Sequence, residues 1–372
     1  MRQHLAYEDP LWFSLIYLKH FFDYPLAPFH LEMFHLLKEP KYEFVVVMAF
    51  RESGKSTIMN TANVLWSILG KPQKKFVVIV SQTQDQAKNH FTNIKEELLY
   101  NELLREDFGP FAEDESAWQK MSLELEYNES KVLSVSREQS IRGIKHNSIR
   151  PDLIICDDIE DISAMVEESV RNETMCRFSS EILPLGSYGT RIFVLGNLIC
   201  QESLLMQLRK SITDGSIKGI FRAYPIIDDD RRILWLDKYR DIENVRGLSK
   251  RFPDTVWVRE FLLKSLSANG RELINPIILD DAFRRPYHDN EIKLPPQQIP
   301  LISQMEEFKI SVPYDRPTIM LFMSDDPEYK LYFGNIYLDE PVMTLREREE
   351  IIGKKAKEWS EELKKQKCRG SD

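Results

Sequence analysis

The sequence has few cysteines, and none is placed where a metal or redox site needs it. The four cysteines of the 372-residue chain are Cys156, Cys176, Cys200 and Cys368. They are scattered, and no two of them approach the CxxC spacing that is typical of zinc and redox sites. We therefore expect four reduced thiols.

Long hydrophobic runs are also absent. The longest, FVVVMAF at 44–50, is far too short to cross a bilayer. The opening segment MRQHLAYEDPLWFSLIYLKHFF contains Lys19 and His20 and has no small-residue cleavage site, so we expect no signal peptide. Hydrophobic residues at 42% and charged residues at 29% are typical of a globular protein. The sequence predicts a cytoplasmic protein without membrane contact.

An excess of positive charge is missing as well. The chain has 50 Lys and Arg against 59 Asp and Glu, which gives a formal net charge of -9. Proteins that coat nucleic acid neutralise many phosphates with basic side chains, so this balance argues against that class. Nucleic acid as a substrate is not excluded, because a protein that must release its track repeatedly is suited by weak local contacts.

The sequence does contain a regular alternation of short apolar runs and helical stretches from about residue 44 to 215. This alternation is the βαβ pattern of an α/β protein with a mostly parallel sheet. Because the runs are apolar throughout, we expect helices on both faces of that sheet. The predicted strands are Phe44–Ala49, Phe76–Val80, Lys131–Ser136, Leu153–Cys156 and Ile192–Leu195. The predicted helices lie at about 55–69, 84–105, 165–183 and 201–213.

The pattern changes after residue 220 and again near residue 293. We expect an α/β domain with a helical lead-in over 1–220 and a linker or lid subdomain over 221–292, with a helix from Ser249 to Ser265. The Pro-rich run KLPPQQIP then begins a small C-terminal unit, 293–372. That unit has a strand-like part at 318–338 and a charged helical tail.

A phosphate-binding loop is indicated by AFRESGKST at 49–57, between a strand and a helix. It matches the Walker A pattern G-x-x-x-x-G-K-[ST], except that Ala49 replaces the first glycine. Gly54 lets the backbone approach the phosphates, Lys55 reaches the β and γ oxygens, and Ser56 can coordinate Mg²⁺. The alternative is a glycine turn that binds nothing. The residues expected to bind nucleotide in this loop are Ser53, Gly54, Lys55, Ser56 and Thr57.

An acidic segment, DLIICDDIED at 152–161, follows about a hundred residues later. A P-loop enzyme needs an acid at the end of an apolar strand to hold Mg²⁺, and Asp157 meets that need. The next carboxylate, Asp158, or else Glu160, would polarise the attacking water. Asp158 is one methylene shorter than the glutamate of most such enzymes, so both candidates stay open. The alternative is an acidic loop that caps the following helix.

Two arginines are candidates for stabilising the transferring phosphoryl group. Arg51 lies inside the phosphate-binding loop, and Arg142 lies shortly before the acidic segment. Either can serve as an arginine finger, one within the chain and one toward a neighbouring subunit. A solvated arginine or a helix-end contact is the alternative for each.

Two further positions complete the predicted site. Asn197 ends the strand in GTRIFVLGN, where a polar side chain can sense the γ-phosphate, although Asn at a strand end is often only a cap. His30, beside Phe29 in the lead-in, is a candidate for flanking adenine, with a place in the core as the alternative.

These motifs, in this order, resemble the large subunits of tailed-phage terminases. The resemblance includes the basic Arg51 before GKST, the Arg142–Gly143 step, RPDLIICDDIED and GTRIFVLGN. It continues through ILWLDKYRDIENVRGLSKRFPDTVWVREFLLKS, with its Trp-acidic start and its R-E-F-L ending at 259–262. It covers roughly residues 25 to 265.

The resemblance implies a P-loop NTPase of the RecA/ASCE-like type that uses ATP and Mg²⁺. It further implies a homo-oligomeric ring that docks transiently on a procapsid in the host cytoplasm and pushes double-stranded DNA inward. The implied partners are the portal protein and the small terminase subunit.

A C-terminal nuclease also belongs to the family pattern, and here the sequence departs from it. The nearest carboxylate step is Asp325 or Asp326 in TIMLFMSDDPEYKLYFGNIYL, and roughly forty residues follow, fewer than a domain usually needs. We therefore expect no complete nuclease in this chain.

Two alternatives remain open at this point: a helicase-like P-loop ATPase, and a degenerate packaging protein without turnover. No second RecA-like domain follows residue 220, which disfavours the first, whereas Ala49 and Asp158 keep the second open. The packaging ATPase and the helicase-like ATPase both hydrolyse ATP. Both therefore require the loop around Gly54 and the carboxylate of Asp157 to face one bound metal ion, whereas a packaging protein without turnover does not.

Overall fold

The computed structural model divides into two units, Met1–Arg284 and Arg285–Asp372. It describes residues 2–111, 121–125, 128–139, 141–229 and 231–266, and the short strands 272–273, 291–292, 318–322 and 332–336. The Pro-rich run at 293–300, Asp325, Asp326 and the charged tail lie outside the described residues. Within the described part, no helix is both long and apolar enough to cross a bilayer.

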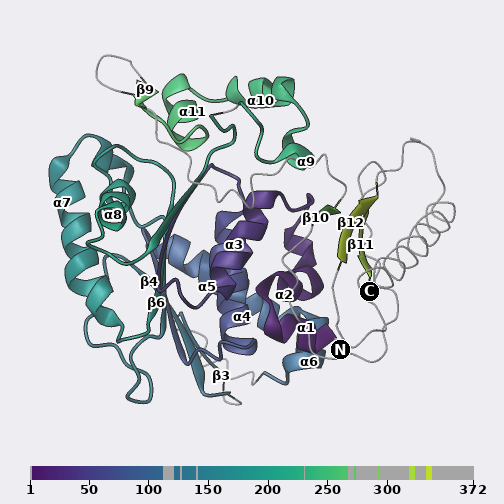
Figure 1. Ribbon diagram of the computed structural model, residues 1–372. Helices are drawn as coiled ribbons and strands as arrows, with labels where there is room; N and C mark the ends of the chain where they lie inside the picture. Colours follow the sequence, from purple (N-terminus) through teal and green to yellow (C-terminus); the bar gives the residue numbers. More distant parts are fainter. Residues whose placement is uncertain are drawn as a thin grey trace, which may run out of the picture. The chain divides into compact units, whose positions relative to one another are not determined.

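A seven-stranded sheet forms the centre of the first unit (Figure 1). All neighbouring strands pair in parallel except the edge pair β3–β4. Their order is β3 (Ser122–Leu125), β4 (Ser130–Ser136), β2 (Phe76–Ser81), β5 (Leu153–Asp157), β6 (Arg191–Gly196), β1 (Phe44–Ala49) and β7 (Ile220–Tyr224). The mostly parallel sheet and all five predicted strands are confirmed. The order places β6 between the loop-bearing strand β1 and the acidic strand β5.

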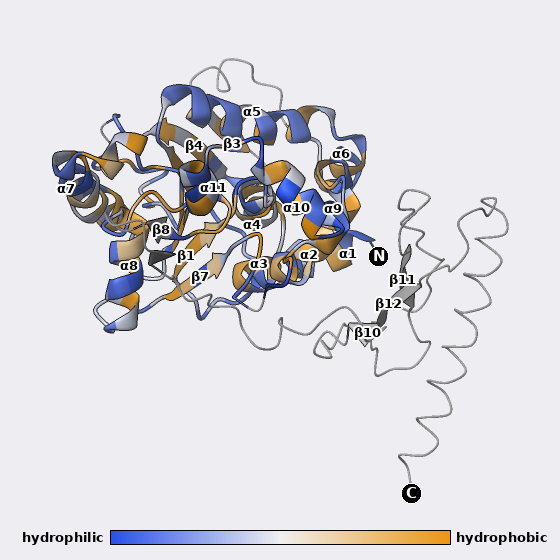
Figure 2. Cartoon of the chain, turned by 90° about the horizontal axis from the view of Figure 1, so that it is seen from above, coloured by the Kyte–Doolittle hydropathy of each residue, from blue (hydrophilic) through white to orange (hydrophobic). Residues whose placement is uncertain are grey.

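Helices cover both faces of the sheet, as predicted (Figures 1 and 2). A separate core of buried side chains fills each side. Val45 and Val47 of β1 point into one core, whereas Val46 and Met48 point into the other, because successive side chains of a strand alternate between its faces. The first face carries α1 (Arg2–Glu8), α2 (Pro10–Tyr17), α3 (Pro28–Lys38), α4 (Asn63–Leu69), α5 (Gln84–Tyr100) and α6 (Glu102–Phe108). The second carries α7 (Glu168–Arg177) and α8 (Leu204–Thr213).

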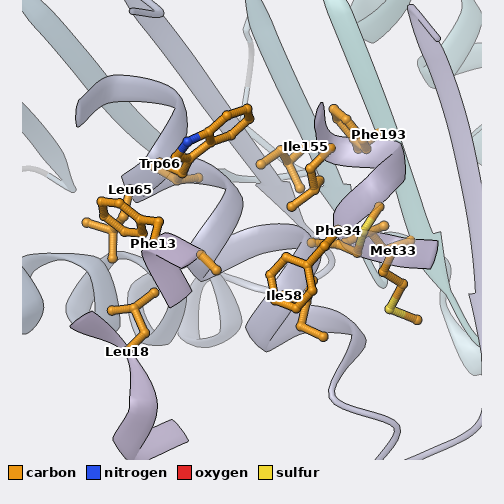
Figure 3. Close-up of a cluster of buried hydrophobic side chains, with 14 of the residues drawn as sticks. Phe13, Leu18, Met33, Phe34, Ile58, Leu65, Trp66, Ile155 and Phe193 are labelled. Carbon is orange, nitrogen blue, oxygen red and sulfur yellow. The ribbon is translucent and has the colours of Figure 1, made fainter. Parts of the chain in front are cut away.

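The helical lead-in is packed directly on the sheet. Figure 3 shows Phe34 of α3 and Ile58, which follows the phosphate-binding loop, in one cluster with Ile155 of β5 and Phe193 of β6. All four are almost fully buried. Burying a side chain of this size contributes about 1.5–3 kcal/mol, so the cluster fixes α3 firmly against the strands that carry the site.

A partly buried arginine also fixes the end of α3. The guanidinium of Arg191, in β6, donates hydrogen bonds to four carbonyl oxygens, in the last turn of α3 and in the turn that follows it. A helix leaves its last carbonyl oxygens without intrahelical partners. The four oxygens that Arg191 contacts belong to Leu36, Leu37, Glu39 and Tyr42. The contact links the lead-in to the middle of the sheet.

The helix predicted at 84–105 is two helices that meet at Asn101. Its side chain accepts a hydrogen bond from the Leu104 N–H and so caps α6. Asn side chains compete with the helical hydrogen bonds of their own segment, which explains the break. The helix predicted at 55–69 is likewise divided into a π-helical turn, Thr57–Ala62, and α4. Such turns occur often at functional sites.

Beyond Gly196 the structure departs further from the predicted elements. Strand β7 begins at Ile220, where we placed the end of the α/β domain, so the sheet continues past that boundary. The sequence signal was weak because Arg222 interrupts this strand, and its guanidinium pairs with the buried Glu32. The helix predicted from Ser249 to Ser265 is shorter, and the lid contains α9 (Leu236–Tyr239), α10 (Ile242–Ser249) and α11 (Asp254–Glu260).

Short helical turns and small sheets complete the described residues. Five turns join the main elements: Lys19–Phe21, Thr57–Ala62, Ile162–Met165, Phe178–Ile182 and Leu183–Leu185. Strands β8 (Ser265–Leu266) and β9 (Glu272–Leu273) form an antiparallel pair. In the second unit, β10 (Glu291–Ile292), β12 (Tyr332–Ile336) and β11 (Thr318–Phe322) form an antiparallel sheet, in line with the strands predicted at 318–338.

Candidate active site

The phosphate-binding loop leaves β1 with the backbone shape that its motif requires. Gly54 has a φ of 80°, a left-handed conformation that glycine adopts without strain. Ala49 is still a strand residue, paired with Tyr224 of β7, and needs no positive φ. This explains how alanine replaces the first glycine of the motif.

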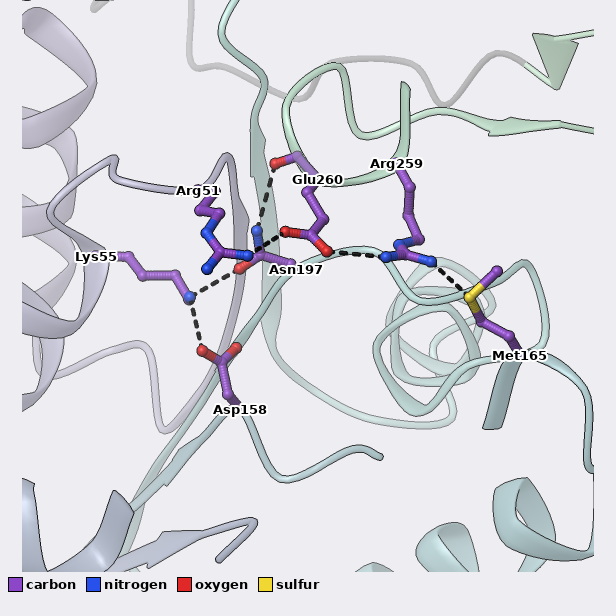
Figure 4. A network of polar contacts seen from close by, with 7 residues as sticks. All are labelled: Arg51, Lys55, Asp158, Met165, Asn197, Arg259 and Glu260. Atoms are coloured by element: carbon purple, nitrogen blue, oxygen red, sulfur yellow. Dashed lines mark hydrogen bonds and ion pairs between the residues drawn. The ribbon is translucent and has the colours of Figure 1, made fainter. Parts of the chain in front are cut away.

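Three predicted residues converge at the centre of the site (Figure 4). The ammonium of Lys55 donates hydrogen bonds to Asn197 Oδ1, at 2.9 Å, and to Asp158 Oδ2, at 3.1 Å. These residues follow three neighbouring strands, β1, β6 and β5, at the same edge of the sheet. Lys55 is only 8% exposed, so its charge depends on these oxygens for solvation.

Asp157 lies against the loop, as the metal hypothesis requires. The Ser56 hydroxyl donates to Asp157 Oδ1 at 3.1 Å, and the carboxylate is almost fully buried. Two residues that we did not predict hold its other oxygen: Asn60 donates to Oδ2 at 3.1 Å, and His90 Nε2 lies 3.5 Å from it. Asn60 stands four positions after Ser56, on one face of the same helix, so spacing offered a signal for it. Nothing in the local sequence marks His90.

The two candidate carboxylates have different surroundings. Asp158 faces the loop through Lys55 and lies beside Gly196, where an added Cβ would come within 3.4 Å of its Oδ1. Both oxygens of Glu160 instead accept backbone N–H groups at the start of α8, from Leu204 at 2.6 Å and Leu205 at 3.4 Å. Burial raises the pKa of Glu160 to about 6, although these two hydrogen bonds oppose the shift.

The two candidate arginines, Arg51 and Arg142, lie in different places. Arg51 borders the site and forms an ion pair with Glu260 at 2.9 Å. Arg142 pairs with Glu181 at 3.4 Å, is not among the residues that line the cavity with Lys55, and has a side chain that is 66% exposed. Arg51 thus lines the same cavity as Lys55, whereas the side chain of Arg142 lies on the surface.

Glu260, at the end of α11, belongs to the R-E-F-L motif at 259–262, but no feature of the sequence indicated that it joins the site. Its backbone oxygen accepts the Arg51 N–H at 2.9 Å and the Asn197 side-chain amide at 3.3 Å. Burial acts to raise the pKa of its carboxyl, but hydrogen bonds from Arg259 and Arg51 outweigh burial and hold that pKa below its ordinary value. Glu260 is therefore an anion that connects the lid to the loop (Figure 4).

Lys55, Asp158 and Asn197 line a cavity of about 390 Å³, together with Arg51 and Glu260. This volume is within the size range of small-molecule sites. The cavity walls carry both signs of charge, a combination that suits a phosphate chain with a metal ion. The polar residues around it are Arg51, Glu52, Lys55, Gln82, Gln86, Asp158, Glu160, Asn197 and Glu260.

His30, which we considered as a contact of adenine, lies in the protein interior instead. It is 1% exposed and lies beneath the loop, where Nδ1 accepts the Ala27 N–H at 2.9 Å and Nε2 lies 2.7 Å from the Ser53 oxygen. A carbonyl can only accept, so Nε2 carries the proton and the ring is neutral. Burial lowers the pKa of His30 to about 3. Both ring nitrogens are thus engaged by backbone groups of the protein.

This depressed pKa predicts a measurable pH dependence of stability. Unfolded His30 binds a proton near pH 6.5 and folded His30 does not, so its contribution is complete above pH 6.5 and declines as the pH falls toward 3. Between pH 8 and pH 5 the loss amounts to about 2 kcal/mol. In urea unfolding, His30→Gln should show a pH dependence smaller by that amount. Equal slopes in the two proteins would contradict a buried neutral imidazole.

Comparison with known proteins finds one family that part of the chain resembles. Residues 21–176 match the family described as the ATPase domain of the phage terminase large subunit gpA. No curated protein matches the chain. The match covers the loop, Asp157, Asp158 and Glu160.

Several solved structures are similar to the chain at low sequence identity. The large terminase ATPase domain of Thermus phage P74-26 is 18% identical over 64% of this chain and 92% of that one, with a TM-score of 0.41. The large terminase of bacteriophage HK97 is 13% identical over 82% of this chain and 62% of that one, also with a TM-score of 0.41. The Phi-28 gp11 DNA packaging motor is 13% identical over 80% and 78%, with a TM-score of 0.32. Since each TM-score is below 0.5, the comparison rests on the family match: residues 21–176 of this chain are similar to the ATPase domain of the phage terminase large subunit.

Proposed function

We propose that this chain hydrolyses ATP and that hydrolysis drives double-stranded DNA into a viral procapsid. The observation that carries the proposal is the meeting of Lys55 and Ser56 of the loop with Asp157 and Asp158 of the acidic strand. A cation, a hydroxyl and two carboxylates in this arrangement are the groups that P-loop enzymes use to bind and cleave a nucleoside triphosphate.

The residues present fit a magnesium ion. Mg²⁺ in phosphate-transfer sites is held by one or two carboxylates, a hydroxyl and the substrate's own oxygens. The hydroxyl of Ser56 and the carboxylate of Asp157, 3.1 Å apart, supply such a donor pair beside the loop. When bound, the ion neutralises charge on the β and γ phosphates. Asn60 and His90 would keep Asp157 oriented toward Ser56.

The remaining residues divide the chemistry among them. The amides from Ser53 to Thr57 and the ammonium of Lys55 hold the phosphates, and Arg51 balances the charge that develops on the γ-phosphate. Asp158 orients the attacking water and accepts its proton, because its carboxylate faces the loop. The engagement of both Glu160 oxygens with α8 supports this choice.

Asn197 offers a route from the nucleotide to the lid. Its carbonyl oxygen accepts from Lys55 and its amide donates to the backbone of Glu260. A phosphate that takes Lys55 away from Asn197 would leave the amide of Asn197 free to reorient. The end of α11 is then the first element to respond to loss of the γ-phosphate.

The partners follow from the family and remain part of the proposal. They are double-stranded DNA, a portal protein and a small terminase subunit, with the chain assembled as a ring in the host cytoplasm. The exposed side chain of Arg142 is suited to reach the nucleotide of a neighbouring subunit.

One assay tests the proposal against both alternatives. The full chain should hydrolyse ATP only when Mg²⁺ is present, and double-stranded DNA should increase the rate. Absence of hydrolysis under all conditions would support the non-catalytic packaging protein. Separation of the strands of a labelled duplex during hydrolysis would support the helicase-like ATPase. The observation that supports the leading function is hydrolysis without unwinding.

A further inference from the structure

A lysine of the lid, Lys238, forms hydrogen bonds with the phosphate-binding loop. Lys238, in α9, donates hydrogen bonds from its ammonium to the Glu52 carbonyl oxygen, at 2.9 Å, and to Glu52 Oε2, at 3.2 Å. Its side chain is only 16% exposed. Holding a lysine side chain in one conformation costs conformational entropy that surface lysines keep. Favourable contacts of the ammonium must therefore offset this cost.

The ammonium sits among aromatic rings that favour a cation. It lies 5.0 Å from the ring centroid of Trp235, 5.2 Å from Tyr239 and 6.0 Å from Tyr24. Each ring face attracts a cation within about 6 Å, and more strongly where water is excluded. The indole N–H of Trp235 donates to the Pro25 oxygen at 2.8 Å, which keeps that ring in place.

Lys238 and His30 hold two consecutive carbonyl groups of the loop. Lys238 takes the oxygen of Glu52, and His30 takes the oxygen of Ser53 at 2.7 Å. Glu52 and Gly54 both have a positive φ, 65° and 80°. Backbone of this kind forms a concave nest in which successive N–H groups converge on an anion. Donors from the lid and the lead-in thus fix both carbonyl groups of this turn.

Glu52 itself poses an electrostatic problem for a loop that binds phosphates. Its carboxylate belongs to the walls of the nucleotide cavity and is about half exposed. A negative charge there repels the negative phosphates of a nucleotide. Among the described residues, the ion pair found for the Glu52 carboxylate is the one with Lys238.

We propose that Lys238 is a positioning residue for nucleotide binding, which acts by neutralising the Glu52 carboxylate and does not touch the nucleotide. The inference rests on the proposed function, since it concerns the affinity of the same loop for Mg-ATP. It makes the lid part of the binding site, because loss of the contact between Lys238 and Glu52 would leave the Glu52 carboxylate unpaired and lower the affinity.

The test is a set of dissociation constants for Mg-ATP and Mg-ADP, measured by titration calorimetry on the full chain. Lys238→Met keeps the aliphatic stem among the rings but removes the charge, and it should weaken both nucleotides about tenfold. Glu52→Gln should bind at least as tightly as the wild type. The double variant should recover most of the loss, because no unpaired carboxylate remains. Lys250→Met, at an exposed position of the lid, is the charge-matched control and should change little.

The outcomes separate this inference from the function on which it rests. If the wild type binds neither nucleotide, the proposed function itself fails. If the wild type binds and Lys238→Met binds equally well, only the role of Lys238 fails. A loss that Glu52→Gln does not rescue would also overturn it, since that result means direct contact with phosphate or a purely structural role. Should Lys238→Met not fold, Lys238→Gln, which retains a donor, takes its place.

Discussion

Replacement of Lys55 by alanine should lower ATP turnover roughly a thousandfold or more, because the charge that faces the transferring phosphate is lost. The fold should persist. Lys55 donates hydrogen bonds to Asp158 and Asn197, and the Asp158 side chain is 45% exposed, so water can replace the ammonium. Steady-state phosphate release, with circular dichroism as the check on folding, measures both parts of the expectation.

Lys71→Ala is a suitable control for the Lys55 variant. Lys71 is also a lysine of the first unit, but its side chain is 62% exposed and pairs with Glu8. Surface ion pairs of this kind contribute about 0–1 kcal/mol, so turnover should stay near the wild-type value. Hydrolysis by Lys55→Ala at the wild-type rate would show that the loop is not the catalytic phosphate site.

The parts of the site that the sequence predicts are those that local patterns encode. Lys55, Asp157 and Asn197 each follow an apolar strand, and the carboxyl ends of parallel strands meet at one edge of a sheet. Strand ends in a βαβ pattern therefore predict a convergence that the structure reproduces. The fold class follows for the same reason, since fully buried strands are recognisable as continuous apolar runs.

The parts that the sequence does not predict depend on contacts between distant segments. Glu260 meets Arg51 across 209 positions of sequence, and Lys238 meets Glu52 across 186. Glu260 lies in the R-E-F-L ending of the family resemblance, but that motif does not say what it contacts, and nothing around Lys238 distinguishes it from other charged lid residues. His30 shows the same limit: an aromatic residue in the lead-in is compatible with adenine or with the core, and only tertiary packing decides.

The choice between Asp158 and Glu160 leads to a second large effect. Asp158→Asn keeps the shape of the side chain and an oxygen for Lys55, but it removes the base that accepts a proton from water. General-base catalysis contributes about 10²–10⁴-fold, so kcat should fall within that range while Mg-ATP affinity is maintained. Single-turnover hydrolysis together with a binding titration separates these two quantities.

Glu160→Gln should behave differently, because Glu160 serves the start of α8. Glutamine offers one carbonyl oxygen where the carboxylate accepts from both Leu204 and Leu205. The loss of one such hydrogen bond at a helix N-terminus costs about 1 kcal/mol of stability. We expect a lower unfolding midpoint and a turnover rate within about tenfold of the wild type.

The reverse pattern would reassign the base. If Glu160→Gln abolished hydrolysis and Asp158→Asn did not, Glu160 would have to leave the amides of α8 when nucleotide binds, and the start of that helix would have to rearrange. Its raised pKa, about 6, would then suit proton transfer near neutral pH. The activity of Asp158→Asn therefore decides between a base that already faces the phosphate loop and one that nucleotide binding must first release.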